Sequence, residues 1–246
     1  MTVPRWRATA GTSLVEVLVT VGILGIAMGV AYTSVIAQLR RHATEMVVAE
    51  TMSAGRTAFD VMRDQVAMAG FGVPVGGAPS TAATIVTAEP SRLSFWASTR
   101  GAHTYLAAAA AKGGRTYNVL NSGTLKVGGS VYLADASRWY LGTVESLKGT
   151  SVQVGSDLPY DFAPGALVVP VELITFELAK GNLVRNGRVF IPNVSSLVFT
   201  YDATAPADVR VVTVSMSVAT RSADPSTGKR RTLTLGGRVA PPNLPL

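Results

Sequence analysis

The chain has 246 residues, of which 48% are hydrophobic, and it carries a formal net charge of +7 at pH 7. It contains no cysteine, which excludes disulfide bonds and any metal or redox site built on thiolates. The length allows one sizeable domain beside a membrane anchor. The basic balance permits contact with nucleic acid or anionic lipid without establishing either.

The chain begins with a short basic segment, residues 1–11, that holds Arg5 and Arg7 and no acid. A secretory signal places small residues after its apolar run, whereas here the small pair Ala10-Gly11 precedes the apolar run. A cut after Gly11 would remove the charged leader and leave the apolar segment at the start of the mature chain.

An uncharged run from Val17 to Leu39 follows. At 1.5 Å per residue it makes a helix of roughly 34 Å, long enough to cross the hydrocarbon core of a bilayer. Gly25 and Gly29 form a close-approach pattern for helix packing, although glycine is also common in membrane helices.

Glu16 lies at the N-terminal edge of this run. A carboxylate there costs less than the roughly 2.5 to 3.5 kcal/mol expected at the bilayer centre. Glu16 is either a tolerated interfacial carboxylate on an ordinary signal anchor or a counter-charge for the free amine of a neighbouring subunit. The second interpretation gives it a role in setting the axial register of packed helices.

The leader charge, the glycine, the glutamate and the apolar run together resemble the N-terminus of type IV prepilins. The resemblance implies that a prepilin peptidase cuts between Gly11 and Thr12 and that the new amine of Thr12 is methylated. It also implies that Glu16 serves filament register and assembly. Thr12 stands where the family usually has phenylalanine.

The helix is expected to continue to about Ala69, because apolar residues recur at three-, four- and seven-residue spacings while charged residues take the other faces. This is the pattern of a helix that covers a sheet. Gly70-Phe71-Gly72 then ends it. The apolar positions are Val48, Met52, Phe59, Met62 and Val66.

The end of this helix, residues 63–71 (Arg-Asp-Gln-Val-Ala-Met-Ala-Gly-Phe), resembles the corresponding stretch of PilW-type minor pilins and J-type pseudopilins, with Ala67 in place of a second basic residue. The resemblance implies a type IV pilin-like α+β fold. A long N-terminal helix, transmembrane in its first half, packs on a mainly antiparallel β head with a small β insertion. The chain then divides into a prepilin leader at 1–11, the helix at 12–70 and a periplasmic β-rich head at 71–246.

β-branched and aromatic segments between turn residues predict the strands of the head. The predicted strands are 92–99, 130–134, 140–147, 151–154 and 167–178, and the PilW resemblance adds 183–185, 191–201 and 209–219. In the last of these, Val212, Val214, Met216 and Val218 alternate with other residues as in a half-buried strand. Residues 127–144 resemble the PilW insertion, and residues 107–114 are a short helix or a loop.

The sequence carries no recognised catalytic or phosphate-binding signature, so we predict no enzyme activity and no cofactor. His42 and His103 have no partner at metal-ligand spacing, so no metal is predicted. Asp202, Asp208 and Asp224 lie in separate loops and bind calcium only if folding gathers them.

Two C-terminal segments are expected outside the sheet. Residues 224–231 form an exposed turn whose end, Lys229-Arg230-Arg231, is a solvated hairpin loop or a contact for phosphate or an acidic partner. Residues 240–246 hold three prolines and are expected to be a tail or an edge cover.

These features favour a minor pilin of the PilW type that joins other minor pilins and the major pilin at an inner-membrane assembly platform. Such a subunit primes filament assembly, starts as a single-pass inner-membrane protein with a periplasmic head, and ends at or near the pilus tip on the cell surface. A J-type pseudopilin of a type II secretion system is the alternative within the same fold. A DNA-binding competence pilin and an anchored periplasmic enzyme are alternatives from other classes.

The predicted cut is tested by the mass of the N-terminal peptide of the protein recovered from its native membrane. We expect a chain that begins at Thr12 and is heavier by one methyl group. Gly11→Leu should leave the leader attached, because a bulky residue fills the position before the cut, whereas Ala8→Leu should be processed normally. A wild-type chain that still begins at Met1 beside an active prepilin peptidase would contradict the prediction.

Overall fold

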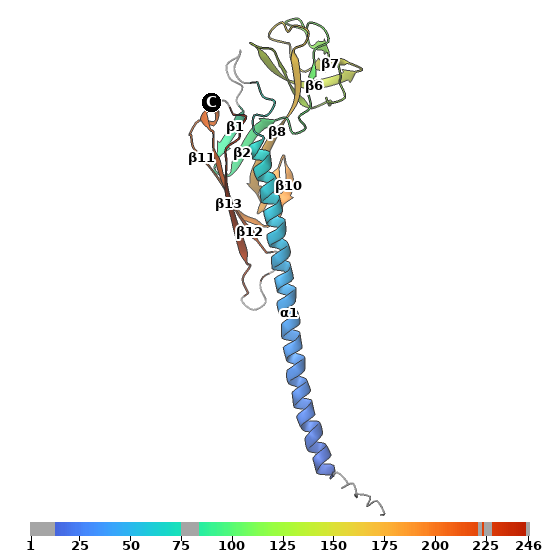
Figure 1. Cartoon of the computed structure of the whole chain (residues 1–246), viewed down its shortest axis with the longest axis vertical. Coiled ribbons are helices and arrows are strands. Elements are labelled where there is room, and N and C mark those ends of the chain that lie inside the picture. The colour runs from blue at the N-terminus through green and yellow to red at the C-terminus, as the bar shows by residue number, and fades with distance from the viewer. Residues whose placement is uncertain (1–12, 75–83, 221–222, 224–227, 245–246) are drawn as a thin grey trace, which may run out of the picture.

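The computed structural model describes residues 13–74, 84–220, 223 and 228–244. One long helix, α1 (Leu14–Ala67), precedes antiparallel strands that form a head around its C-terminal end (Figure 1). The expected α+β layout, a long apolar N-terminal helix followed by antiparallel sheets, is confirmed. The strands are β1 (Ile85–Glu89), β2 (Arg92–Ala97), β3 (Thr104–Tyr105), β4 (Thr116–Asn118), β5 (Ser130–Ala134), β6 (Trp139–Lys148), β7 (Ser151–Val154), β8 (Leu167–Ala179), β9 (Asn182–Arg185), β10 (Arg188–Ile191), β11 (Val194–Tyr201), β12 (Val212–Ala219) and β13 (Thr232–Val239).

The helix ends where the sequence predicts its stop signal. Met68 caps α1 through a backbone N–H that reaches back to the carbonyls of the last turn. Gly70 follows at φ +84°, a left-handed conformation that a helix cannot continue through. A Cβ added to Gly70 would lie 2.5 Å from the carbonyl oxygen of Asn243, so the C-terminal segment closes directly over the helix end. Leu244 is buried in the same core, and this segment therefore acts as a cover.

The C-terminal half of α1 buries one face against the head. Val48 and Met52 are half-buried, and Phe59, Met62 and Val66 are buried, which confirms the apolar stripe predicted from the sequence. Because these positions follow the helical repeat, a single face meets the sheet while Asp60 and Arg63 stay in solvent.

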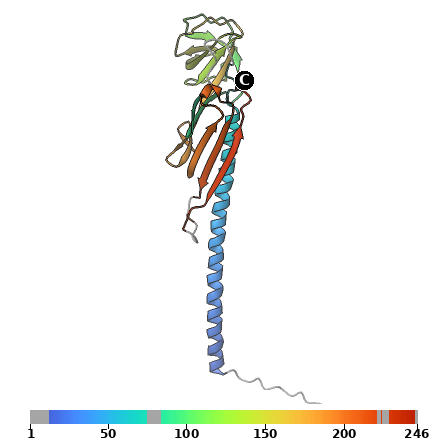
Figure 2. The same cartoon turned by 90° about the vertical axis from the view of Figure 1, so that its left-hand side faces the viewer.

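A three-stranded sheet, in the order β11-β12-β13, lies along this face of α1 (Figure 2). Val212, Val214, Met216 and Val218 of β12 are buried, and the side chains between Val212 and Met216 are exposed, as the alternation predicts. Two glycines let the layers approach closely. A Cβ on Gly55 would lie 3.5 Å from Val218, and one on Gly237 would lie 3.2 Å from the ring of Phe59.

A second, ten-stranded sheet has the path β1-β2-β8-β5-β6-β7-β4, with β3 and β9 also paired to β8. β8 belongs to two parts of the head at once. Its first residues pair with β5, from Leu167 to Val171, and the next pair with β2, from Glu172 to Glu177. This one strand therefore joins the part of the head beside the helix to the lobe at the far end of the molecule (Figure 1).

The far lobe has its own hydrophobic core, formed by residues between Leu106 and Val168. β5 shows how the lobe is attached. Val131 and Leu133 point into the lobe's core, whereas Tyr132 between them points to the opposite face and packs edge-on against Trp96 and Trp139. Residues 127–144, which resemble the PilW insertion in sequence, lie within this larger lobe, which also includes β3, β4 and β7.

Two predicted segments differ from the structure. The single strand predicted over 191–201 is wrong, because β10 ends at Ile191 and β11 begins at Val194. Pro192 has no N–H to donate to a ladder, and Asn193 has φ +58°, which turns the chain between the two strands. Residues 107–114 form an irregular segment, held by an isolated bridge between Ala110 and Phe162, and no helix is present there.

The buried stripe predicts a local stability difference between neighbouring positions of α1. Met62 is fully buried whereas Val61 is 38% exposed. Met62→Ala should lower the free energy of unfolding by about 2 to 5 kcal/mol because it leaves a cavity, and Val61→Ala should change it by less than about 1 kcal/mol. Denaturant unfolding of the full chain in detergent measures both, and equal effects would contradict the packing described.

Candidate functional site

The N-terminal half of α1 projects from the head with no protein around it (Figure 1). Every residue from Ser13 to Val35 is exposed. Among the described residues, α1 is the one helix long and apolar enough to cross a membrane, and its apolar part has no buried residue. A surface of this extent far exceeds the few hundred Å² of contiguous apolar area that a soluble monomer normally exposes. Its length and composition are those of a membrane span, which lipid or other apolar helices would cover.

Glu16 is the single acidic residue on this projecting surface and lies in the first turn of α1. Its side chain is exposed, and within the described part of the chain it forms no ion pair or hydrogen bond. The first turn of a helix carries partial positive charge on its free N–H groups, which favours an acid at this position. In an apolar surrounding, the carboxylate requires a cation as its partner. The predicted cleavage and methylation positions, Gly11 and Thr12, lie outside the described residues.

The two threonines of this half donate hydrogen bonds inside the helix. Thr20 donates to the carbonyl of Glu16 at 2.7 Å, and Thr33 donates to the carbonyl of Val30 at 2.9 Å. Such bonds let a threonine lie in hydrocarbon without an exposed donor. Glu16 is the one charged side chain on the described part of this surface, from Ser13 to Leu39.

The three glycines of the apolar run lie open to the surroundings. A Cβ placed on Gly22, Gly25 or Gly29 would meet nothing within 4 Å. Gly55 is a glycine of the same helix that is covered, and there Val218 of β12 approaches the helix backbone closely. The open glycines thus offer the same close approach to a neighbouring helix.

A polar network fixes the head relative to the helix. Arg185 of β9 donates from Nε to Oε1 of Gln65 on α1 at 2.7 Å, and its Nη2 lies 3.3 Å from Oε1 of Glu172 on β8. Asn186 donates to the same carboxylate oxygen at 2.7 Å. Residues 63–71 suggested a family from their sequence, and here Gln65 makes the structural link while Arg63 is exposed. No local pattern indicates this role of Gln65, because its partner Arg185 is 120 residues away in the chain.

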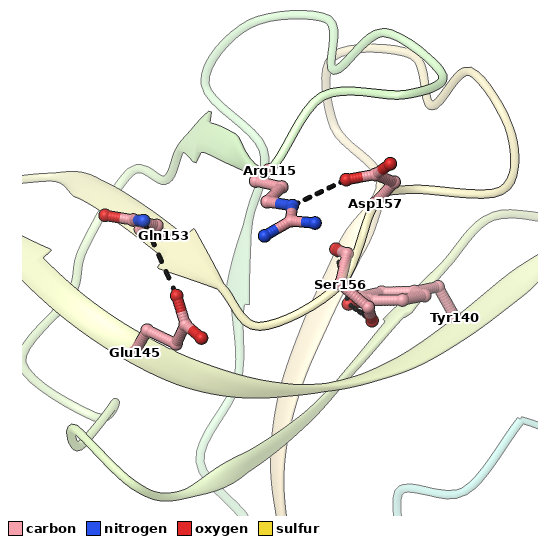
Figure 3. A network of polar contacts seen from close by, with 6 residues as sticks. All are labelled: Arg115, Tyr140, Glu145, Gln153, Ser156 and Asp157. Carbon is pink, nitrogen blue, oxygen red and sulfur yellow. Dashed lines mark hydrogen bonds and ion pairs between the residues drawn. The ribbon is translucent and has the colours of Figure 1, made fainter.

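The far lobe carries a second polar cluster (Figure 3). Arg115 donates to Asp157 at 2.6 Å, and the hydroxyls of Tyr140 and Ser156 lie 2.8 Å apart. Both members of the Arg115–Asp157 pair are more than half exposed, so the pair adds little stability. Burial raises the pKa of the neighbouring Tyr117, whose hydroxyl stays protonated at neutral pH. The cluster joins β4, β6 and the loop after β7.

A hollow of about 310 Å³ lies where the end of α1 meets the far lobe, and Ser98 and His103 are among its lining residues. His103 packs edge-on against Tyr105, with ring centroids 5.5 Å apart, and both side chains line the hollow. The buried hydroxyl of Ser98 has no hydrogen-bond partner within the described part of the chain. His42 is on the helix surface, 3.8 Å from Glu45.

Two of the three aspartates considered for calcium, Asp202 and Asp208, lie in the described part of the chain. Asp202 uses one carboxylate oxygen to accept the backbone N–H groups of Arg210 and Val211, both at 2.9 Å, at the start of the connection from β11 to β12. Asp208 ends a short 3-10 turn, Pro206–Asp208, and Asp224 lies outside the described residues. Across the ranges that the structure describes, no cluster of three His, Asp or Glu side chains is placed to hold a metal ion.

Comparison of the chain with models of protein families, with curated proteins and with solved structures finds no match. The function is therefore argued from the geometry of the projecting helix and the head.

The contacts of Asp202 predict a pH-dependent contribution to stability. The N–H groups of Val211 and Arg210 hold the pKa of the Asp202 carboxyl below its ordinary value. A lowered pKa in the folded state stabilises the fold above the unfolded value of about 3.9, and the contribution disappears as pH falls through the folded value.

Asp202→Asn keeps an oxygen acceptor and removes the charge. The wild type should exceed this variant in stability at pH 7, and the difference should shrink when urea unfolding is repeated below about pH 4. The Asp208 side chain accepts no hydrogen bond within the described residues. Asp208→Asn should therefore show the same stability difference from the wild type at pH 7 and below about pH 4. A constant difference for Asp202→Asn would refute the role given to its charge.

Proposed function

We propose that this protein is a minor subunit of a type IV pilus machine, of the PilW type. One observation carries the proposal: an uncovered apolar half-helix presents a single carboxylate, Glu16, in its first turn. A plain anchor has no need of that charge, whereas a helix that packs beside the free N-terminal amine of another subunit does. The prepilin-like order of leader, Gly11 and apolar run supports the same function.

The layout of the head supports the type IV pilin-like fold. The C-terminal half of α1 lies along an antiparallel sheet, with the same face that the heptad-like spacing predicts. Gln65 and Arg185 hold the helix and head at a set orientation. In a subunit built this way, the axial position of the helix sets the position of the head. A filament in which every head occupies an equivalent place requires this.

The subunit acts with partners at each stage of this proposed cycle. The prepilin peptidase removes residues 1–11, and the apolar helix stays in the inner membrane. Other minor pilins then bind to it through their own apolar helices. The complex primes the filament on the assembly platform and remains at or near the tip. A J-type pseudopilin would use the same helix in the same way, in a secretion system instead of a pilus.

Glu16→Ala tests the charge directly. We expect the variant to insert into the membrane normally and to lose incorporation into filaments and co-purification with partner subunits. An unpaired amine left in the bundle would cost about 3 to 5 kcal/mol of assembly free energy. Glu16→Asp keeps the charge and should retain part of the assembly.

Thr20→Val is the matched control, because the Thr20 hydroxyl bonds only within the helix and its loss leaves no partner unpaired. The measurements are filament number, recovery of this subunit in sheared filaments and co-purification from membranes. Unchanged values for Glu16→Ala in all three would remove the register role, and equal losses for Thr20→Val would point to general disruption of the helix.

A further inference from the structure

Five exposed basic residues lie on the membrane side of the head. Arg40 and Arg41 follow directly after the apolar run of α1. Lys229, Arg230 and Arg231 lead into β13. The two groups are far apart in the sequence, and the fold brings them to the same end of the head.

The ladder between β12 and β13 shows where the second group lies. Ala219 pairs with Thr232, and Thr220 continues the ladder by a hydrogen bond to the Arg231 carbonyl at 2.8 Å. This end of the sheet points along α1 toward its projecting half (Figures 1 and 2). Val218, one residue before Ala219, lies against Gly55 of the helix. The basic residues thus lie at the end of the sheet that is nearest the projecting half of the helix.

The remaining distance to the apolar run is short. The helix rises roughly 24 Å from Leu39 to Gly55 at 1.5 Å per residue. Three residues separate Thr232, the first residue of β13, from Lys229, and a stretch of this length covers at most about 10 Å. The separation left is comparable to the reach of a long cationic side chain plus a Debye length of about 8 Å.

The two groups also face the same side. Arg41 lies one heptad before Val48 and two before Gly55, so it continues the helix face that meets the head. The acids nearby on α1 are Glu45, which lies 3.8 Å from His42, and Glu50, and both are exposed. Within the described residues, no carboxylate lies within 4 Å of Arg40, Arg41 or Arg230.

We propose that Arg40, Arg41 and Lys229–Arg231 form a surface that binds the phosphate groups of anionic lipid at the membrane from which the helix projects. If the apolar run spans a bilayer, Arg40 and Arg41 lie at its surface, and Lys229, Arg230 and Arg231 lie at the end of the sheet that faces it. Anionic lipid attracts a Lys or Arg side chain that lies within a Debye length of the membrane surface. Each such residue raises the membrane-binding constant roughly fivefold. The head is then held down beside its own helix until the subunit leaves the membrane. This inference rests on the membrane span of the proposed function and not on membership of a filament.

The test uses the full chain in lipid nanodiscs, made either of phosphatidylcholine alone or of phosphatidylcholine with phosphatidylglycerol. Because the chain has no cysteine, Thr232→Cys gives a single fluorophore position at the start of β13, and Thr150→Cys gives one in the far lobe. A quencher on the lipid headgroups reports how near each position lies to the membrane. We expect stronger quenching at position 232 in the anionic discs, reduced by added salt, and weak quenching at position 150 in both.

Lys229→Glu/Arg230→Glu/Arg231→Glu should reduce quenching at position 232 in anionic discs to the level in neutral discs. Lys112→Glu/Lys126→Glu/Lys148→Glu makes the same change of net charge in the far lobe and should have no effect. Arg40→Gln/Arg41→Gln tests the helix group without altering the hairpin and should reduce the quenching in part.

Resistance of each variant to alkaline extraction separates the outcomes. Loss of insertion would overturn the membrane span itself. Normal insertion with equal quenching in both lipids, or full quenching in the hairpin variant, would overturn the lipid contact alone. Binding of a short DNA duplex that is lost in the same hairpin variant, with no response to anionic lipid, would assign the surface to nucleic acid.

Discussion

The structure depends on one continuous helix that passes through two environments. Its C-terminal half buries a single face against strands, with Phe59, Met62 and Val66 in the core. Its N-terminal half exposes apolar side chains on every side, and no packing among the described residues compensates for them. Water is a poor solvent for that surface, so the helix is stable only beside lipid or other apolar helices. Membrane anchoring and helix bundling are therefore two solutions to the same physical problem.

Direct contacts fix the position of the head relative to this helix. Gln65, Arg185 and Glu172 form a charge-assisted network that joins α1 to β9 and β8. β8 then runs on into the far lobe, and Tyr132 packs at the junction between the lobes, where burial raises its pKa to about 12. Because each joint is packed or hydrogen-bonded, a shift of the helix along a bundle moves the far lobe with it.

Charge is placed at the two ends of the apolar run and nowhere within it. Glu16 lies at the N-terminal end, and Arg40 and Arg41 lie at the other, beside a head whose hairpin adds further cations. A charge in hydrocarbon is costly, whereas a charge at its boundary finds a counter-ion. In the proposed function the acid pairs with a cation of a neighbouring subunit, and in the proposed lipid contact the bases meet phosphates at a membrane surface. The two proposals thus assign assembly to one end of the apolar run and anchoring to the other.

The sequence by itself determined the local structure: the apolar helix, its stop at Gly70 and the alternation along β12, because these follow from side-chain periodicity and backbone conformation. β5 and β7 begin and end where their residue types predict. Only the tertiary structure decided that β8 serves two cores, that Pro192 and Asn193 divide a predicted strand, and that Gln65 meets Arg185. Strand pairing and such contacts join residues far apart in the chain, and no local pattern encodes them. The cut at Gly11 remains a prediction from motif, whereas the exposure of Glu16 follows from the absence of any strand beside the first half of the described helix.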